Sequence, residues 1–163
     1  MQRILLSLLA LPIHMLLNAQ FNWQWARQYT GEIQPSVGGL VVDAAGNSVV
    51  CGSYYGELNI GTLPVLTSSG QSDLYVAKFG PDGTPLWMRS AGGANFDDAL
   101  DVAVDGEGRI TITGYFQSPS ITVGGTTLNR QGSMDILVAQ YDANGNALWA
   151  QRYGWSASSG LEW

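Results

Sequence analysis

The sequence predicts an all-β fold built from repeated modules of four antiparallel strands. Three observations support this prediction: few charges and many glycines, apolar residues alternating with polar ones, and a 62-residue period. Of the 163 residues, 12% are charged, 45% are hydrophobic and 21 are glycine. Such a composition favours short strands joined by tight turns, and it excludes a coiled coil, a helical bundle and a basic nucleic-acid-binding arm.

The N-terminal segment, residues 1–19, has the pattern of a secretory signal peptide. A positive residue precedes the apolar run Ile4 to Leu17, which is too short to span a bilayer, and Ala19 ends a plausible cleavage site. An N-terminal core helix or a membrane anchor is the alternative, and Pro12 argues against it. We therefore expect a secreted or extracytoplasmic chain, in the periplasm or at the cell surface, without membrane insertion after signal removal.

Removal of this segment limits the chemistry of the mature chain. It takes away the one histidine, His14, and leaves one cysteine, Cys51. Ser-His-Asp and Cys-His nucleophile systems, imidazole zinc sites and histidine acid–base catalysis therefore do not fit this stretch. The run Val49–Gly52 predicts that Cys51 is a small buried strand residue, with no internal disulfide. The 13 acidic and 7 basic residues disfavour nucleic acid and anionic lipid as partners.

A 62-residue period organises the chain after residue 20. The spacing relates Trp25, Trp87 and Trp149. It also relates Asp43 to Asp105, Gly46 to Gly108, Gly52 to Gly114, Asp73 to Asp135, Val76 to Val138, Ala77 to Ala139 and Gly83 to Gly145. We therefore divide residues 20–163 into units of about 25–86 and 87–148 and a partial unit, 149–163.

Each full period supplies the strands of one module, because apolar residues alternate with a period of two. The second module is predicted at residues 101–105, 110–116, 136–141 and 147–153, and the first at 40–43, 48–54, 74–79 and 86–90. Glycine-containing turns join the first strand to the second and the third to the fourth. The longer connection between the second and third strands, about 117–134, is expected to hold an extra hairpin around Gly124-Gly125.

Two recurring residue types predict structural roles. The tryptophan of the fourth strand stands at one fixed register, so we expect it to pack between stacked sheets, with a sugar-stacking platform as the alternative. Asp73 and Asp135 recur just before the third strand, and this position predicts a hydrogen bond from the backbone to each carboxylate.

Two acidic segments are candidates for chemistry. Residues 142–146 place oxygen-bearing side chains at alternate positions, as a calcium loop does, but the glycine and glutamate that such a loop requires are missing, so a hairpin turn is favoured. Asp97, Asp98 and Asp101 form the densest acidic cluster and suit glycoside hydrolysis by paired carboxylates, while turn capping explains them equally well. We therefore predict no catalytic, cofactor-binding or metal residue.

Two pairs of strings resemble the SBBP repeat of bacterial secreted β-propellers. They are GGLVVDAAGNSVVCGSYY with SDLYVAKFGPDGTPLWMRSAGG, and DDALDVAVDGEGRITITGYF with DILVAQYDANGNALWAQRYG. The resemblance covers roughly residues 23–155 and departs from the repeat at Cys51, at Gly80-Pro81 and at 129–131. It implies β-propeller blades of four antiparallel strands, with two full repeats plus the start of a third, and thus an incomplete propeller.

The resemblance implies a scaffold rather than a shared activity. We expect a secreted, non-enzymatic β-propeller module that presents loops near 58–70 and 121–132 to a protein or glycan partner, without a cofactor. The alternative is part of a propeller enzyme that acts on polysaccharide through carboxylates. Because a propeller closes with about 4 to 8 blades, we expect an N-terminal fragment of a longer chain, or a short chain that completes a ring by self-association.

Overall fold

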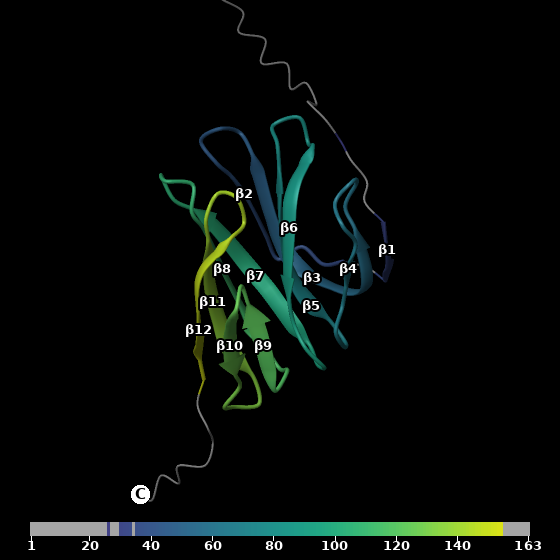
Figure 1. The fold of residues 1–163 in the computed structure, drawn as a ribbon, viewed down its shortest axis with the longest axis vertical. Coiled ribbons are helices and arrows are strands. Elements are labelled where there is room, and N and C mark those ends of the chain that lie inside the picture. The colour runs from purple at the N-terminus through teal and green to yellow at the C-terminus, as the bar shows by residue number, and fades with distance from the viewer. Residues whose placement is uncertain (1–25, 27–29, 34, 155–163) are drawn as a thin grey trace, which may run out of the picture.

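The computed structural model describes residue 26 and residues 30–33 and 35–154, and these residues form strands and turns without a helix. Accordingly, none of the described residues belongs to a helix that is long and apolar enough to cross a membrane. One antiparallel sheet of six strands and another of four make up most of the structure (Figure 1). The predicted signal peptide, Trp25 and the segment after Gly154 lie outside the described residues.

The two sheets share an up-and-down topology of four strands. Within the first sheet, the four strands that we call blade 1 pair in the order β2-β3-β5-β6, and the second sheet, blade 2, has the corresponding order β7-β8-β11-β12. Blade 1 comprises β2 (Gly39–Val42), β3 (Ser48–Asn59), β5 (Asp73–Phe79) and β6 (Pro85–Ala91). Blade 2 comprises β7 (Asp97–Val104), β8 (Ile110–Phe116), β11 (Asp135–Tyr141) and β12 (Ala147–Tyr153). A four-stranded meander of this kind is the blade of a β-propeller, so the predicted fold class is confirmed.

The strand register repeats with the sequence period. Ser48 pairs with Phe79 in blade 1, and Ile110 pairs with Tyr141 in blade 2, one period later. The irregularity that follows Lys78 in β5 also recurs after Gln140 in β11. Residues 62 positions apart therefore occupy equivalent places in the two blades.

The sequence located most strands and missed the additions to blade 1. β8 and β12 have the predicted bounds, whereas β7 begins four residues earlier, because Asp97 pairs with Phe116. β3 continues past the predicted end because its last residues pair with two short strands, β1 (Thr30–Ile33) and β4 (Leu66–Thr67). The extra hairpin is confirmed as β9 (Ser120–Val123) and β10 (Thr126–Asn129).

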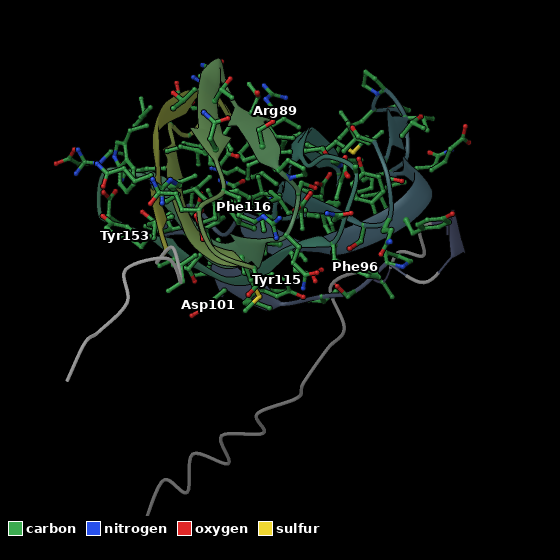
Figure 2. The ribbon with its side chains drawn as sticks, turned by 90° about the horizontal axis from the view of Figure 1, so that it is seen from below. Arg89, Phe96, Asp101, Tyr115, Phe116 and Tyr153 are labelled. Atoms are coloured by element: carbon green, nitrogen blue, oxygen red, sulfur yellow. The ribbon has the colours of Figure 1, made fainter. Side chains whose placement is uncertain are left out.

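The two blades stack face to face and enclose one shared core. β7 contacts β2, β3 and β5 of the neighbouring blade. Leu74 and Val76 of β5 are fully buried on the side of blade 1 that faces blade 2, which we call the forward face. Phe116 of blade 2 lies in the same core, whereas Tyr153 lies at the outer edge of the molecule (Figure 2).

A second core covers the opposite side of blade 1, which we call its backward face. Tyr75 and Phe79 of β5 pack there with residues from the 58–70 connection, including Leu58 and Ile60. β5 is consequently buried along its whole length, whereas β11 alternates between buried and partly exposed residues. The first connection between the second and third strands thus covers part of one face of its own blade.

Candidate functional site

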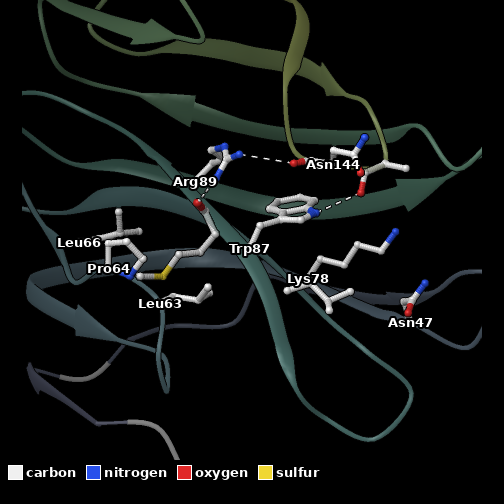
Figure 3. A pocket seen from close by; sticks show the side chains of 11 residues that line it. Asn47, Leu63, Pro64, Leu66, Lys78, Trp87, Arg89 and Asn144 are labelled. Atoms are coloured by element: carbon white, nitrogen blue, oxygen red, sulfur yellow. Dashed lines mark hydrogen bonds between the residues drawn. The ribbon is translucent and has the colours of Figure 1, made fainter.

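A groove at the outer junction of the two blades is the candidate site, and we call it the Trp87 groove. Its volume is about 910 Å³. Trp87, Met88 and Arg89 of β6 and Lys78 of β5 line it together with the 63–66 segment and the turn of blade 2 (Figure 3). The groove therefore combines an aromatic ring, apolar side chains and two basic side chains.

Trp87 joins the two blades at this groove. Its side chain is 8% exposed, and its Nε1 donates a hydrogen bond of 3.1 Å to the main-chain oxygen of Ala143 in the β11–β12 turn. Gly145 of that turn approaches so closely that a Cβ there would lie 2.7 Å from the indole ring. The predicted packing of a tryptophan between stacked sheets is thus confirmed for Trp87, while sugar stacking at the other tryptophans stays untested.

Arg89 presents its charge beside this ring. Nε donates to the main-chain oxygen of Gly145 at 2.8 Å, and Nη1 donates to that of Met88 at 2.8 Å. The guanidinium carbon lies 5.7 Å from the centroid of Trp87, a cation–π distance. Among the described residues, no carboxylate forms an ion pair with Arg89. Nη2 donates to the main-chain oxygen of Asn144 at 3.4 Å, so each guanidinium nitrogen has a main-chain acceptor while the charge has no ion-pair partner among the described residues.

Lys78 is the second basic residue of the groove, and its charge is already paired. Nζ lies 3.0 Å from Oδ2 of Asp43, and both side chains are largely buried. Burial alone would raise the pKa of Asp43, but hydrogen bonds from Asn47 and Lys78 outweigh it and lower that pKa to about 2. The pair ties β5 to the β2–β3 turn, so Lys78 is a structural residue.

The 58–70 connection supplies the apolar wall of the groove. Leu63, Pro64 and Leu66 line it, and Pro64 is exposed. Part of the first predicted loop therefore lines the groove, and its role in binding a partner stays a prediction. The second connection differs, because Ile121 and Val123 of the β9–β10 hairpin are buried in the shared core.

The three carboxylates predicted as an acidic cluster serve separate local contacts. Asp97 is fully buried and accepts hydrogen bonds from the backbone N–H groups of Gly93, Gln117 and Ser118 and from the Ser118 hydroxyl. Asp98 accepts from the Tyr115 hydroxyl, and this bond raises the pKa of that phenol to about 12. The exposed Asp101 accepts the N–H of Val102. The buried Asp97 is occupied by four donors and has no free acceptor for chemistry.

The other predicted features are structural. In residues 142–146, Asp142 Oδ1 accepts the N–H groups of Asn144 and Asn146, so this segment is a capped hairpin turn as predicted. Asp135 accepts the N–H groups of Gln131 and Gly132, and this confirms the predicted backbone bond before the third strand. Burial raises the pKa of the Cys51 thiol to about 11, in agreement with a buried strand residue.

Sequence reasoning did not single out Arg89, the basic residue of the groove that forms no ion pair with a described residue. A signal was present, since Arg27 and Arg89 stand one period apart, two residues after Trp25 and Trp87. An arginine at a fixed distance from the repeated tryptophan indicates a contact shared by successive blades. Arg27 itself lies outside the described residues.

One comparison with known proteins agrees with this architecture. The chain is similar to an uncharacterized WD repeat-containing protein of Acanthamoeba polyphaga mimivirus, with 30% identity over 127 residues. The match covers 68% of this chain and 9% of the relative, so the chain spans only a small part of that protein. No family model matches the sequence. Fold and similarity together indicate a β-propeller-type repeat protein.

Proposed function

We propose that this chain is an exported, non-enzymatic binding module of the SBBP type, and that the Trp87 groove binds an extended segment of a partner protein. The observation that carries the proposal is the guanidinium of Arg89, which forms no ion pair among the described residues and lies beside an apolar wall, in a chain whose net charge is −6. A segment with apolar residues and one carboxylate matches this surface, because a guanidinium binds a carboxylate through paired hydrogen bonds.

Selection from a random dodecapeptide display library tests this function. Peptides enriched on the purified chain should carry an acidic residue next to apolar ones, and Arg89→Gln should weaken them at least tenfold in fluorescence anisotropy. Arg109→Gln is the matched control, since Arg109 is exposed and lies in the β7–β8 turn. Failure to enrich any peptide, or equal binding to Arg89→Gln and wild type, would contradict the proposal.

The glycan and enzyme alternatives give other outcomes. Polysaccharide binding that survives Arg89→Gln but is lost on Trp149→Ala would transfer the function to the exposed tryptophan of β12, which is 39% exposed. Polysaccharide hydrolysis that vanishes on Asp98→Asn would support the enzyme alternative.

Export is the second part of the proposal and rests on the pattern of residues 1–19. When the full chain is expressed in a bacterial host with a general secretion pathway, the exported product should begin at Gln20. Intact mass of the exported and retained fractions measures this. A product that stays in the cytoplasm with Met1 intact would contradict export.

The third part concerns the two outer faces of the blade pair. On the backward face of blade 1, an apolar cavity of about 280 Å³ is lined by Leu40, Tyr75 and Phe79, among others. On the forward side of blade 2, Ile136 and Tyr153 are more than half exposed. Inside the molecule the same two kinds of face pack on each other, so we infer that further blades cover them, from a longer chain or from another copy. Sedimentation of residues 20–163 distinguishes these: a discrete ring-sized oligomer indicates self-association, and a monomer indicates blades of a longer chain.

A further inference from the structure

Two equivalent carboxylates differ in whether a positive side chain compensates them. In blade 2, Asp135 accepts backbone N–H groups and also faces Arg152, whose Nη1 lies 3.2 Å from Oδ2. Burial would raise the pKa of Asp135, but the backbone donors and Arg152 outweigh it, so that the pKa lies below its usual value. Here a buried carboxylate has a complete set of partners.

In blade 1, the counterpart Asp73 lacks this compensation. Ser90 stands one period before Arg152, at the place of the arginine. Asp73 is 2% exposed; Oδ2 accepts the N–H of Ser69 at 3.0 Å, whereas Oδ1 is buried without a hydrogen-bond partner. Burial raises the pKa of Asp73 more than hydrogen bonds from Ser69 lower it, and the nearby carboxylate of Asp97 adds to the rise. A buried acceptor without a donor is costly, so the position favours a ligand that donates.

Space for such a ligand lies beside Asp73. A cavity of about 440 Å³, which we call the Asp73 pocket, opens between blade 1 and the β9–β10 hairpin. Gly92 lines it too, and a Cβ at Gly92 would lie 2.2 Å from Asp73 Oδ1, so glycine is required for the chain to pass this close to the carboxylate. Most of the other lining residues carry hydroxyl groups: Tyr54, Thr67, Ser69, Ser90, Ser120 and Thr122.

Two of these hydroxyl groups stand where blade 2 has a larger side chain or one without a hydroxyl. Tyr54 Oη lies 2.8 Å from Ser90 Oγ, and the two stand where blade 2 has Phe116 and Arg152. Hydroxyl oxygens accept hydrogen bonds from a planar cation, and the carboxylate supplies the opposite charge. The pocket therefore has the polar groups that a guanidinium needs.

We propose that the Asp73 pocket binds the guanidinium group of an arginine side chain from a partner protein, at the place that Arg152 occupies in blade 2. The site is separate from the Trp87 groove, whose Arg89 suits a carboxylate instead. It does not depend on the function proposed for that groove, because Arg89 does not line the pocket.

Titration with Nα-acetyl-L-arginine amide, followed by amide chemical shifts in nuclear magnetic resonance, tests the proposal on the mature chain. We expect saturable shifts at Ser69 and Gly92 in wild type. The citrulline analogue has nearly the same shape without the charge and should bind at least tenfold more weakly. Equal binding of both analogues, or no saturable shift at these amides, would overturn the proposal.

Variants of the pocket make the test specific. Ser90→Arg, alone or with Tyr54→Phe, should supply the missing guanidinium from within, abolish binding of the arginine analogue and leave the melting temperature equal or higher. Asp73→Asn should weaken binding at least tenfold and does not depend on the folding of the arginine variants. Asp105→Asn, at an exposed turn, is the control for charge. If the arginine analogue bound Asp73→Asn as tightly as wild type, the proposed site would be contradicted. We expect Arg89→Gln to bind the arginine analogue as tightly as wild type, because Arg89 does not line the pocket.

Discussion

The forward faces of the two blades are built alike, yet one is buried and the other is open. Leu74 in β5 is fully buried, whereas Ile136, one period later in β11, is 54% exposed. Trp87 in β6 is 8% exposed, and Trp149 in β12 is 39% exposed. The strand register around each pair is the same. The difference therefore comes from the presence of blade 2 against blade 1, not from the strands themselves.

This comparison shows that the repeat encodes a surface that becomes core only when another blade covers it. Burial of a large aromatic or aliphatic side chain contributes about 1.5–3 kcal/mol by transfer from water. Equivalent substitutions in the two blades should therefore have unequal effects on stability, and their difference measures the contribution of stacking.

The largest expected effect belongs to the two tryptophans. Trp87→Ala should reduce the free energy of unfolding by about 3–5 kcal/mol, because it empties a packed position and removes the bond to Ala143. Trp149→Ala should cost about 0.5 kcal/mol, as expected for an exposed position. Urea denaturation followed by circular dichroism measures both. Equal losses of unfolding free energy in the two variants would contradict the claim that only Trp87 is buried by blade stacking.

The next effect concerns the turn that meets Trp87. Gly145 has φ 79°, and Gly108 has φ 77° in the β7–β8 turn, where a Cβ meets nothing closer than 3.7 Å. Gly108→Ala should cost about 1–2 kcal/mol from backbone strain alone. Gly145→Ala should cost about 1–3 kcal/mol more, because its Cβ would collide with the indole. Equal costs in thermal unfolding would show that the turn does not support the tryptophan.

A smaller effect with opposite signs is expected at the two equivalent aspartates. The lowered pKa of Asp135 adds stability above pH 3.8, and this is lost as the pH falls through the folded-state pKa. The raised pKa of Asp73 adds stability below pH 3.8, and this is lost as the pH rises through the folded-state pKa. Asp135→Asn and Asp73→Asn should each remove one of these dependences when unfolding is measured from pH 2.5 to 7. Dependences of the same sign would contradict the account.

Much of the fold could be predicted from the sequence because its strongest signals are periodic. The spacing of Trp87 and Trp149 located the fourth strands, and the paired glycines located the turns. The extension of β3 could not be predicted, because its partners β1 and β4 are short strands whose pairing depends on tertiary contacts. The end of a strand is decided by the neighbour it finds.

The candidate sites were harder to predict than the strands, because one joins distant segments and the other depends on a residue that differs between the two repeats. The Trp87 groove forms between distant segments of the chain. The hydrogen bonds of Trp87 and Arg89 across it join residues that are 56 positions apart in the sequence, so no short motif contains both sides. The Asp73 pocket arises where Ser90 replaces the arginine of the other blade. A comparison of the two repeats position by position shows the substitution, but only the structure shows the cavity beside it.

Cysteine accessibility at one pair of equivalent positions tests the central claim most directly. In a Cys51→Ala background, Leu74→Cys and Ile136→Cys place a thiol at the same strand position of the two forward faces. We expect Ile136→Cys to react with a maleimide at nearly the rate of the unfolded chain and Leu74→Cys to react at least a hundredfold more slowly. Equal rates at the two positions would contradict the stacking of blade 2 on the forward face of blade 1.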